Sequence, residues 1–161
     1  MGYVSKNLMS GENVVHVGKV HWFIFFPGVM LFLISIWLFG VATEDGVGPI
    51  FGTISFLFSI ASLTKAFFFK ISTELAITSK RVIAKVGFIS RKTVELNHSK
   101  VESFNIDQSI FGRIFGFGTV VVCGTGGGKT PIPNIGDPLE FRRQAMNVVD
   151  ETGASPAHAK G

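Results

Sequence analysis

The sequence has few charged residues and almost no cysteine. Charged side chains make up 16% of its 161 residues, whereas ordinary soluble domains carry roughly 25%. Cys123 is the single cysteine, which excludes an intrachain disulfide framework and a structural zinc site built from cysteines. A chain of this length is also too short for a multidomain enzyme. The net charge of +4 fits an anionic partner, but by itself it favours neither nucleic acid nor an acidic membrane surface.

Long apolar runs take the place of charge. Residues 22–42 (WFIFFPGVMLFLISIWLFGVA) are 21 residues without a charge, enough for a helix to cross a hydrocarbon core of roughly 30 Å. Residues 47–64 form a second uncharged run of 18 residues, and apolar residues continue past Lys65 to Phe69. Neither run has the polar face of a helix packed against a soluble core, and a signal peptide would have a shorter apolar region. We therefore predict two transmembrane helices.

The short connection between the two runs predicts their arrangement. Only residues 43–46 separate them, so the helices form an antiparallel hairpin with both flanks on one side. Lys6, Lys19, Lys65 and Lys70 lie on the flanking side, whereas the connection carries two acids and no base. The positive-inside rule then puts both termini in the cytoplasm, in a multi-pass protein of the cell inner (cytoplasmic) membrane. The spans contain too few ionisable groups for a transport path, so we interpret the hairpin as an anchor.

A β domain is predicted after the second run, because the apolar period changes to two from about Ser72. We expect five or six short antiparallel strands, with segments around residues 75–77, 82–86, 94–96, 104–106 and 119–123. Glycine and polar clusters separate these segments, which is typical of a small barrel or a strongly bent sheet.

A helix is predicted to close this barrel. Asp137-Pro138 followed by Glu140 is a typical helix start, and apolar residues then recur on one face at Phe141, Ala145, Val148 and Val149. The predicted fold is an α+β membrane protein, with a two-helix transmembrane hairpin followed by a small antiparallel β-barrel of pleckstrin-homology (PH) type, capped by a C-terminal helix. We assign residues 1–21 to a cytoplasmic N-terminal segment, 22–69 to the hairpin, 70–151 to the PH-like domain and 152–161 to a disordered tail.

Several runs carry a resemblance to a known family. They are Glu12 with His21-Trp22 before the first span, residues 74–83 (ELAITSKRVI), residues 108–120 (QSIFGRIFGFGTV), residues 134–138 and Phe141-Arg142. In these features the chain resembles the bacterial membrane-anchored PH-like domains of the YdbS-like group. The resemblance implies a PH-like fold on a membrane hairpin, no established catalytic activity and largely undefined ligands.

Catalytic and metal sites are not expected. Residues 123–130 (CGTGGGKT) end like a phosphate-binding P-loop, but Cys123 occupies the first glycine position, and Pro131 and Pro133 forbid the required helix. A glycine-rich hairpin loop is the alternative that we favour. The four histidines, His16, His21, His98 and His158, share no metal-ligand spacing. No nucleophile motif surrounds any serine, so we expect no enzyme activity and no cofactor.

The remaining candidate residues are basic. In a meander, the turns after alternate strands share one end, which gathers a set that we call the distal end: Lys80, Arg81, His98, Lys100 and Lys129. The connection from residue 69 to residue 73 reaches at most ~14 Å, so the other end of the barrel is expected to face the bilayer. That proximal face carries Arg91, Lys92 and Arg113. We expect Phe111 and Phe115 to fill the bottom of the barrel, the alternative being that they dip into the membrane interface.

Two functions follow from this arrangement. The first is a non-enzymatic, membrane-tethered PH-like binding module whose distal end, or whose exposed strand edge, recruits a protein partner or a second copy of the chain. The alternative is a sensor or structural factor that binds anionic lipid headgroups through the proximal face. Nucleic acid is not an expected partner.

Overall fold

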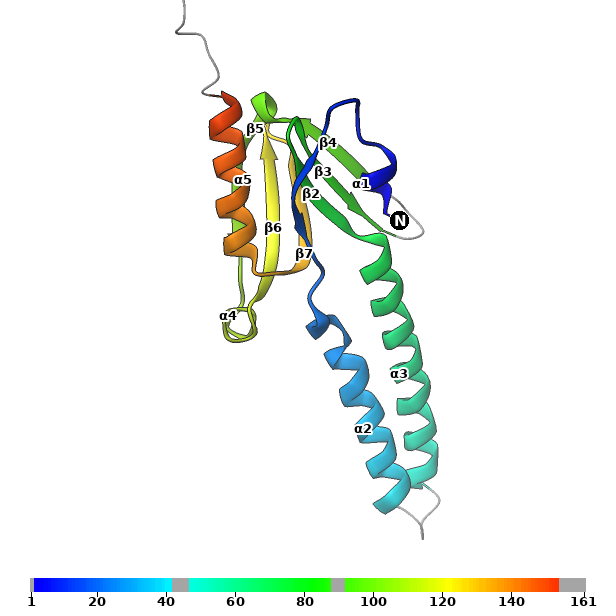
Figure 1. Cartoon of the computed structure of the whole chain (residues 1–161). Helices are drawn as coiled ribbons and strands as arrows, with labels where there is room; N and C mark the ends of the chain where they lie inside the picture. Colours follow the sequence, from blue (N-terminus) through cyan, green and yellow to red (C-terminus); the bar gives the residue numbers. More distant parts are fainter. Residues whose placement is uncertain (1, 42–46, 88–91, 154–161) are drawn as a thin grey trace, which may run out of the picture. The chain divides into compact units, whose positions relative to one another are not determined.

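The computed structural model describes residues 2–41, 47–87 and 92–153. The chain forms two compact units (Figure 1). Met1–His21 and Ser72–Gly161 together make the β unit, and Trp22–Ile71 makes the helical unit. The interpretation of residues 1–21 as a segment outside the folded domain therefore differs from the structure, because a strand in this segment completes a sheet. The predicted tail beyond Gly153 and the connection at residues 42–46 lie outside the described residues.

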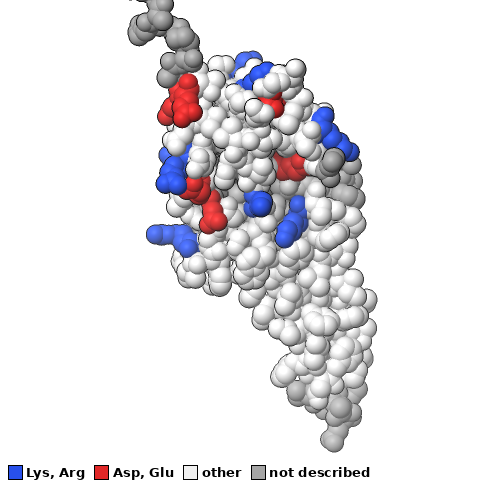
Figure 2. Space-filling view, in the orientation of Figure 1, with Lys and Arg blue, Asp and Glu red and all other residues white. Residues whose placement is uncertain are grey.

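The helical unit consists of the 3₁₀ turn η1 (Trp22–Phe25), α2 (Phe26–Val41) and α3 (Val47–Ser72). Two helical stretches are long and apolar enough to cross a membrane by length and composition, Trp22–Gly40 with a mean hydropathy of 2.3 and Val47–Ser72 with 1.6. Most of their large apolar side chains are exposed, and charged residues of this unit, Lys65 and Lys70, lie near the C-terminal end of α3. In Figure 2 the described part of the unit farthest from the β unit shows no charged side chain. This is unlike a helix pair buried in a soluble core.

Small residues bring α2 and α3 into contact. A Cβ atom added to Gly28 would lie 2.7 Å from the Leu63 side chain, so only glycine permits this approach. Ser59 Oγ donates a hydrogen bond to the Gly28 carbonyl at 2.9 Å, and Ser55 Oγ donates to the Leu31 carbonyl at 3.0 Å. Close packing through small residues with serine hydrogen bonds is typical of helices in lipid.

Two antiparallel sheets form the β unit. Sheet A contains, in spatial order, β1 (Val14–Gly18), β2 (Glu74–Thr78), β3 (Arg81–Val86) and β4 (Lys92–Asn97); sheet B contains β5 (Val101–Asp107), β6 (Phe117–Gly124) and β7 (Lys129–Gly136). A bridge between Val20 and Ile135 joins the continuation of β1 to β7. All five expected strand segments are present, and β1 is a strand that the sequence reasoning did not anticipate.

The helix α5 (Pro138–Gly153) covers sheet B (Figure 1). Phe141 and Ala145 are fully buried among the core residues Phe104, Val120 and Ile132. The predicted helix start is confirmed, since the Phe141 N–H donates to the Asp137 carbonyl at 3.0 Å. Glu140 does not cap this helix, and instead its carboxylate accepts hydrogen bonds from Gln144 and Arg143 in the following turn.

The N-terminal segment covers the outer face of sheet A. The one-turn helix α1 (Tyr3–Lys6) packs Val4 against Ala76 and Ile83, which point away from the main core. The Glu74 carboxylate accepts hydrogen bonds from the Tyr3 and Val4 N–H groups at 2.7 and 3.1 Å, in the position where a helix start favours an anion. Because both faces of β2 are covered, Leu75, Ala76, Ile77 and Thr78 are all buried.

Candidate binding surfaces

Arg81, which we expected at the distal end, is buried in an ion-pair cluster. Its Nε lies 3.0 Å from Glu12 Oε1, its Nη2 donates to Glu12 Oε2 at 3.1 Å, and its Nη1 contacts Glu95. Burial alone would raise the pKa of Glu12, but hydrogen bonds from the Met9 N–H, from Thr78 Oγ1 and from Arg81 outweigh it and lower the pKa to about 2. The Arg81 charge is thus neutralised inside the protein, which removes this residue from the anion-binding set.

The turns at the distal end do meet. His98, in the 3₁₀ turn η2 (His98–Lys100), is buried with Nε2 2.9 Å from the Thr78 carbonyl, which links η2 to the β2–β3 turn. The Thr125 N–H donates to the Lys100 carbonyl at 2.9 Å, which links η2 to the β6–β7 turn. Three turns thus meet at this end, and the buried His98 connects them from the inside.

A shallow groove of about 520 Å³ lies at this end. Its walls are Met9, Ser79, Lys80, Asn97, His98, Ser99, Val149 and Thr152. Lys80 is exposed, with Nζ 2.9 Å from the Ser10 carbonyl, and Lys100 and Lys129 are exposed on the neighbouring turns. Lys80 is thus the lysine in the groove wall, which also includes the apolar side chains of Met9 and Val149, and Lys100 and Lys129 add positive charge beside it. Positive charge of this kind suits an acidic surface of a partner.

The glycine-rich loop before Lys129 is a hairpin turn, as predicted. The Gly124 N–H donates to the Gly128 carbonyl at 2.9 Å, and Gly126 and Gly127 adopt φ values of 129° and 79°, which favour glycine. Lys129 begins strand β7 and not a helix. The P-loop interpretation is therefore excluded, because no helix N-terminus follows the glycines to hold a phosphate.

The three basic residues expected on the proximal face do not form one described group in the structure. Arg91 lies outside the described residues. Lys92 is exposed at the start of β4, the last strand of sheet A, whereas Arg113 is exposed on the short helix α4 (Ile110–Phe115), which joins two strands of sheet B. Arg113 also shares a hollow with Asp137 and Glu140. Positive charge near α4 is therefore balanced by acids.

The aromatic residues of α4 do not fill the barrel. Phe111 is 64% exposed and Phe115 is 43% exposed, so the expectation of core filling is wrong. The core at this end is already closed by Ile135 and Phe141, which are almost fully buried. Helix α4 is too short for a buried face to be predicted from the period of its apolar residues. The sequence also did not indicate that Ile110 and Ile114 would be exposed. A useful signal was the flanking pair Ser109 and Gly116, which predicts a separate capped turn.

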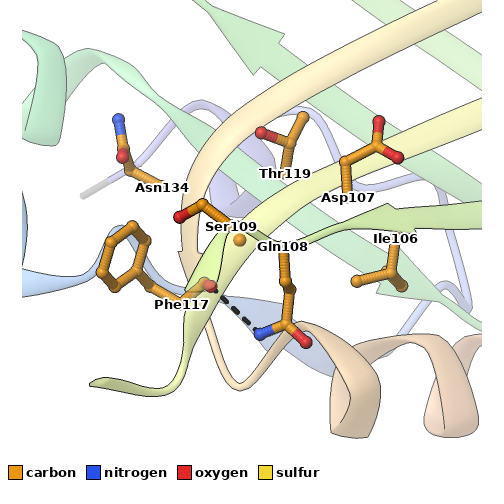
Figure 3. A pocket seen from close by; sticks show the side chains of 8 residues that line it. Ile106, Asp107, Gln108, Ser109, Phe117, Thr119 and Asn134 are labelled. Carbon is orange, nitrogen blue, oxygen red and sulfur yellow. Dashed lines mark hydrogen bonds between the residues drawn. The ribbon is translucent and has the colours of Figure 1, made fainter. Parts of the chain in front are cut away.

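Figure 3 shows a hollow of about 570 Å³ beside α4. Its lining residues are Ile106, Asp107, Gln108, Ser109, Phe117, Gly118, Thr119 and Asn134. Gln108 is already engaged, because its Nε2 donates to the Phe117 carbonyl at 3.0 Å (Figure 3). Asp107 is the only titratable side chain in this lining, and Ser109 Oγ accepts a hydrogen bond from the Gly112 N–H at 3.1 Å. Within the described ranges there is likewise no group of His, Cys, Asp and Glu that could hold a metal ion.

Comparison with known families decides what kind of domain this is. The family model described as a bacterial PH domain matches residues 15–148, which include most of β1, the helical unit, the other six strands and most of α5. The chain belongs to the bacterial PH domain family. No curated protein and no solved structure matches it. In this bacterial PH domain the family match begins within β1, which agrees with the structure in counting residues 15–21 as part of the domain. Membership supports a binding module.

Proposed function

We propose that this bacterial PH domain is a non-enzymatic binding module tethered to the inner membrane by the α2–α3 hairpin, with both termini in the cytoplasm. The observation that carries the proposal is the insertion of two long apolar helices between the first and second strands of a PH-type domain. A domain interrupted in this way would be anchored at two points of its chain, and not by a single flexible linker.

The places where the chain enters and leaves the helical unit indicate which surface of the β unit is available to a partner. Gly18 and Leu75 pair with each other at the end of sheet A from which the chain leads into and out of the helical unit; we call this the entry end. Strand β2 runs from Glu74 to Thr78, so the Lys80 turn lies roughly 15 Å further along. The distal end, now reduced to Lys80, His98, Lys100 and Lys129, is therefore the surface that we propose for an acidic protein partner or a second copy of the chain.

Tethering and orientation can be tested in cells with single cysteines in a Cys123→Ala background. A membrane-impermeant thiol reagent should label Asp45→Cys from outside, whereas Thr125→Cys should react only after lysis. The reverse pattern would invert the topology. Release of the protein by carbonate extraction would contradict the tether altogether.

Partner binding can be tested with a photo-crosslinking amino acid at Ser99, in the wall of the distal groove. We expect a discrete adduct that disappears in Lys80→Glu/Lys100→Glu/Lys129→Glu and persists in the control Lys92→Glu/Arg113→Glu. An adduct that is unaffected by the first variant would contradict recognition through the distal lysines.

The alternative, anionic lipid binding through Arg91, Lys92 and Arg113, predicts the opposite dependence. Selective enrichment of phosphatidylglycerol with the protein, lost in Arg91→Glu/Lys92→Glu/Arg113→Glu and kept in the distal variant, would favour it. Basic residues at an anionic leaflet contribute about 1 kcal/mol each, so three reversals should abolish the enrichment.

A further inference from the structure

The helix α4 exposes large apolar side chains to an unusual degree. Ile110 is 78% exposed, Phe111 is 64% exposed and Ile114 is 70% exposed, and the buried residue of α4 is Gly112. We call these three side chains the α4 apolar cluster. Scattered apolar residues are normal on a protein surface, but a contiguous group on one turn marks an interaction site.

This turn is held firmly in its conformation. Ser109 Oγ accepts a hydrogen bond from the Gly112 N–H at 3.1 Å, and the Arg113 N–H donates to the Ser109 carbonyl at 2.9 Å. At the other end, Gly116 adopts φ 75° and its N–H bonds the Gly112 carbonyl. Both ends of α4 are thus capped, so the apolar cluster is presented by a fixed element.

The position of α4 indicates what the cluster meets. Phe117, two residues after α4, stacks its ring on His21 with centroids 5.6 Å apart, and the chain continues from His21 directly into Trp22. The Gly136 N–H also donates to the Lys19 carbonyl at 2.9 Å, so the strand next to Phe117 is bonded to the same segment. The α4 apolar cluster therefore belongs to the entry end of the β unit.

Charge argues against an electrostatic contact at this place. Arg113 is the basic residue of α4, and Asp107, Asp137 and Glu140 lie in the hollows on either side. The surroundings are mixed in sign, unlike the basic surface that anionic headgroups attract. Exposed isoleucine and phenylalanine side chains are suited instead to the boundary between headgroups and acyl chains.

We propose that α4 inserts Ile110, Phe111 and Ile114 into the interfacial layer of the bilayer that the chain itself crosses. The inference rests on the proposed membrane tether and extends it, because insertion would fix the orientation of the β unit and not only its distance. One turn of helix is too small to hold a free protein on a membrane, but a tether raises the effective concentration and makes a weak contact sufficient.

The test is a depth measurement on the full chain in phosphatidylcholine nanodiscs. An environment-sensitive fluorophore is attached to Ile114→Cys, or to Phe111→Cys as a second site, in the Cys123→Ala background. Nitroxide-labelled lipids then report depth. Thr125→Cys at the distal end is the aqueous control and Leu33→Cys in α2 is the membrane control. We expect shallow nitroxides to remove most of the fluorescence at Ile114, unchanged by added salt, and to leave Thr125 unaffected.

The controls separate the two proposals. Quenching at Leu33 without quenching at Ile114 overturns the α4 inference and keeps the tether, whereas no quenching at Leu33 overturns the tether. A blue-shifted but unquenched label at Ile114 means that protein covers α4, which also overturns the lipid assignment. In a chain labelled at Ile110→Cys, the double substitution Phe111→Ser/Ile114→Ser should abolish the quenching, because it removes the apolar side chains that insert. The variant should still fold, since these exposed side chains contribute little to the core.

Discussion

Glu12 Oε1 lies 3.0 Å from Arg81 Nε, although the helical unit separates the two residues in the sequence. The pair joins the segment before the first apolar helix to the strand pair after the second. The Glu12 carboxylate also accepts hydrogen bonds from Thr78 Oγ1 and the Met9 N–H. A buried charge pair with these additional hydrogen bonds is costly to break, because the remaining charge stays buried without a partner.

Replacing Glu12 by Gln should therefore destabilise the β unit. Arg81 would keep Glu95 as a partner, so we expect a loss of about 3 kcal/mol in the free energy of unfolding, near the lower end for a broken buried pair. Denaturant unfolding of the full chain in mild detergent, followed by hydrogen exchange of the strands, would measure it. Glu102→Gln, on the exposed side of β5, is the matched control. Equal stability of the two variants would rule out a structural role for the pair.

The same carboxylate predicts how stability depends on pH. The folded state lowers the pKa of Glu12 from 4.5 to about 2, so its contribution is complete above pH 4.5 and is lost as the pH falls towards 2. The wild-type chain should lose stability over this window more steeply than Glu12→Gln. The stability difference between them should shrink as the pH falls. Denaturation midpoints measured from pH 6 to pH 3 provide the comparison, and parallel curves would contradict the assignment.

Local patterns predicted most of the fold, and long-range pairing explains what they missed. Strands β2 to β6 and the start of α5 were visible because alternation and the Asp137-Pro138 signal depend only on neighbouring residues. Strand β1 was not visible, since most of its side chains are exposed and its partner β2 lies beyond the helical unit. The availability of Arg81 was misjudged for the same reason, because nothing near it in sequence reveals Glu12.

The helix pair offers a third prediction. Gly28→Val should push α2 away from α3, because even a Cβ atom would lie 2.7 Å from Leu63. Disulfide formation between Phe32→Cys and Phe56→Cys, whose native rings lie 6.1 Å apart, would report the separation in a Cys123→Ala chain. We expect the disulfide yield to fall severalfold in the Gly28→Val background. Gly40→Val, where an added Cβ meets nothing within 4 Å, is the control and should leave the yield unchanged.

Gly112→Ala should loosen α4 without unfolding the β unit. The added Cβ would lie 2.5 Å from the Phe117 carbonyl oxygen, a backbone atom that has little freedom to move. Overpacking of this kind costs about 1–3 kcal/mol, so the amides of Gly112, Arg113 and Gly116 should exchange roughly tenfold faster or more. Gly128→Ala is the matched control, because its Cβ meets open space. If the α4 amides exchange at the wild-type rate, the close contact of Gly112 with Phe117 is not what holds α4 in place. Another interaction would then have to keep Ile110, Phe111 and Ile114 in their positions.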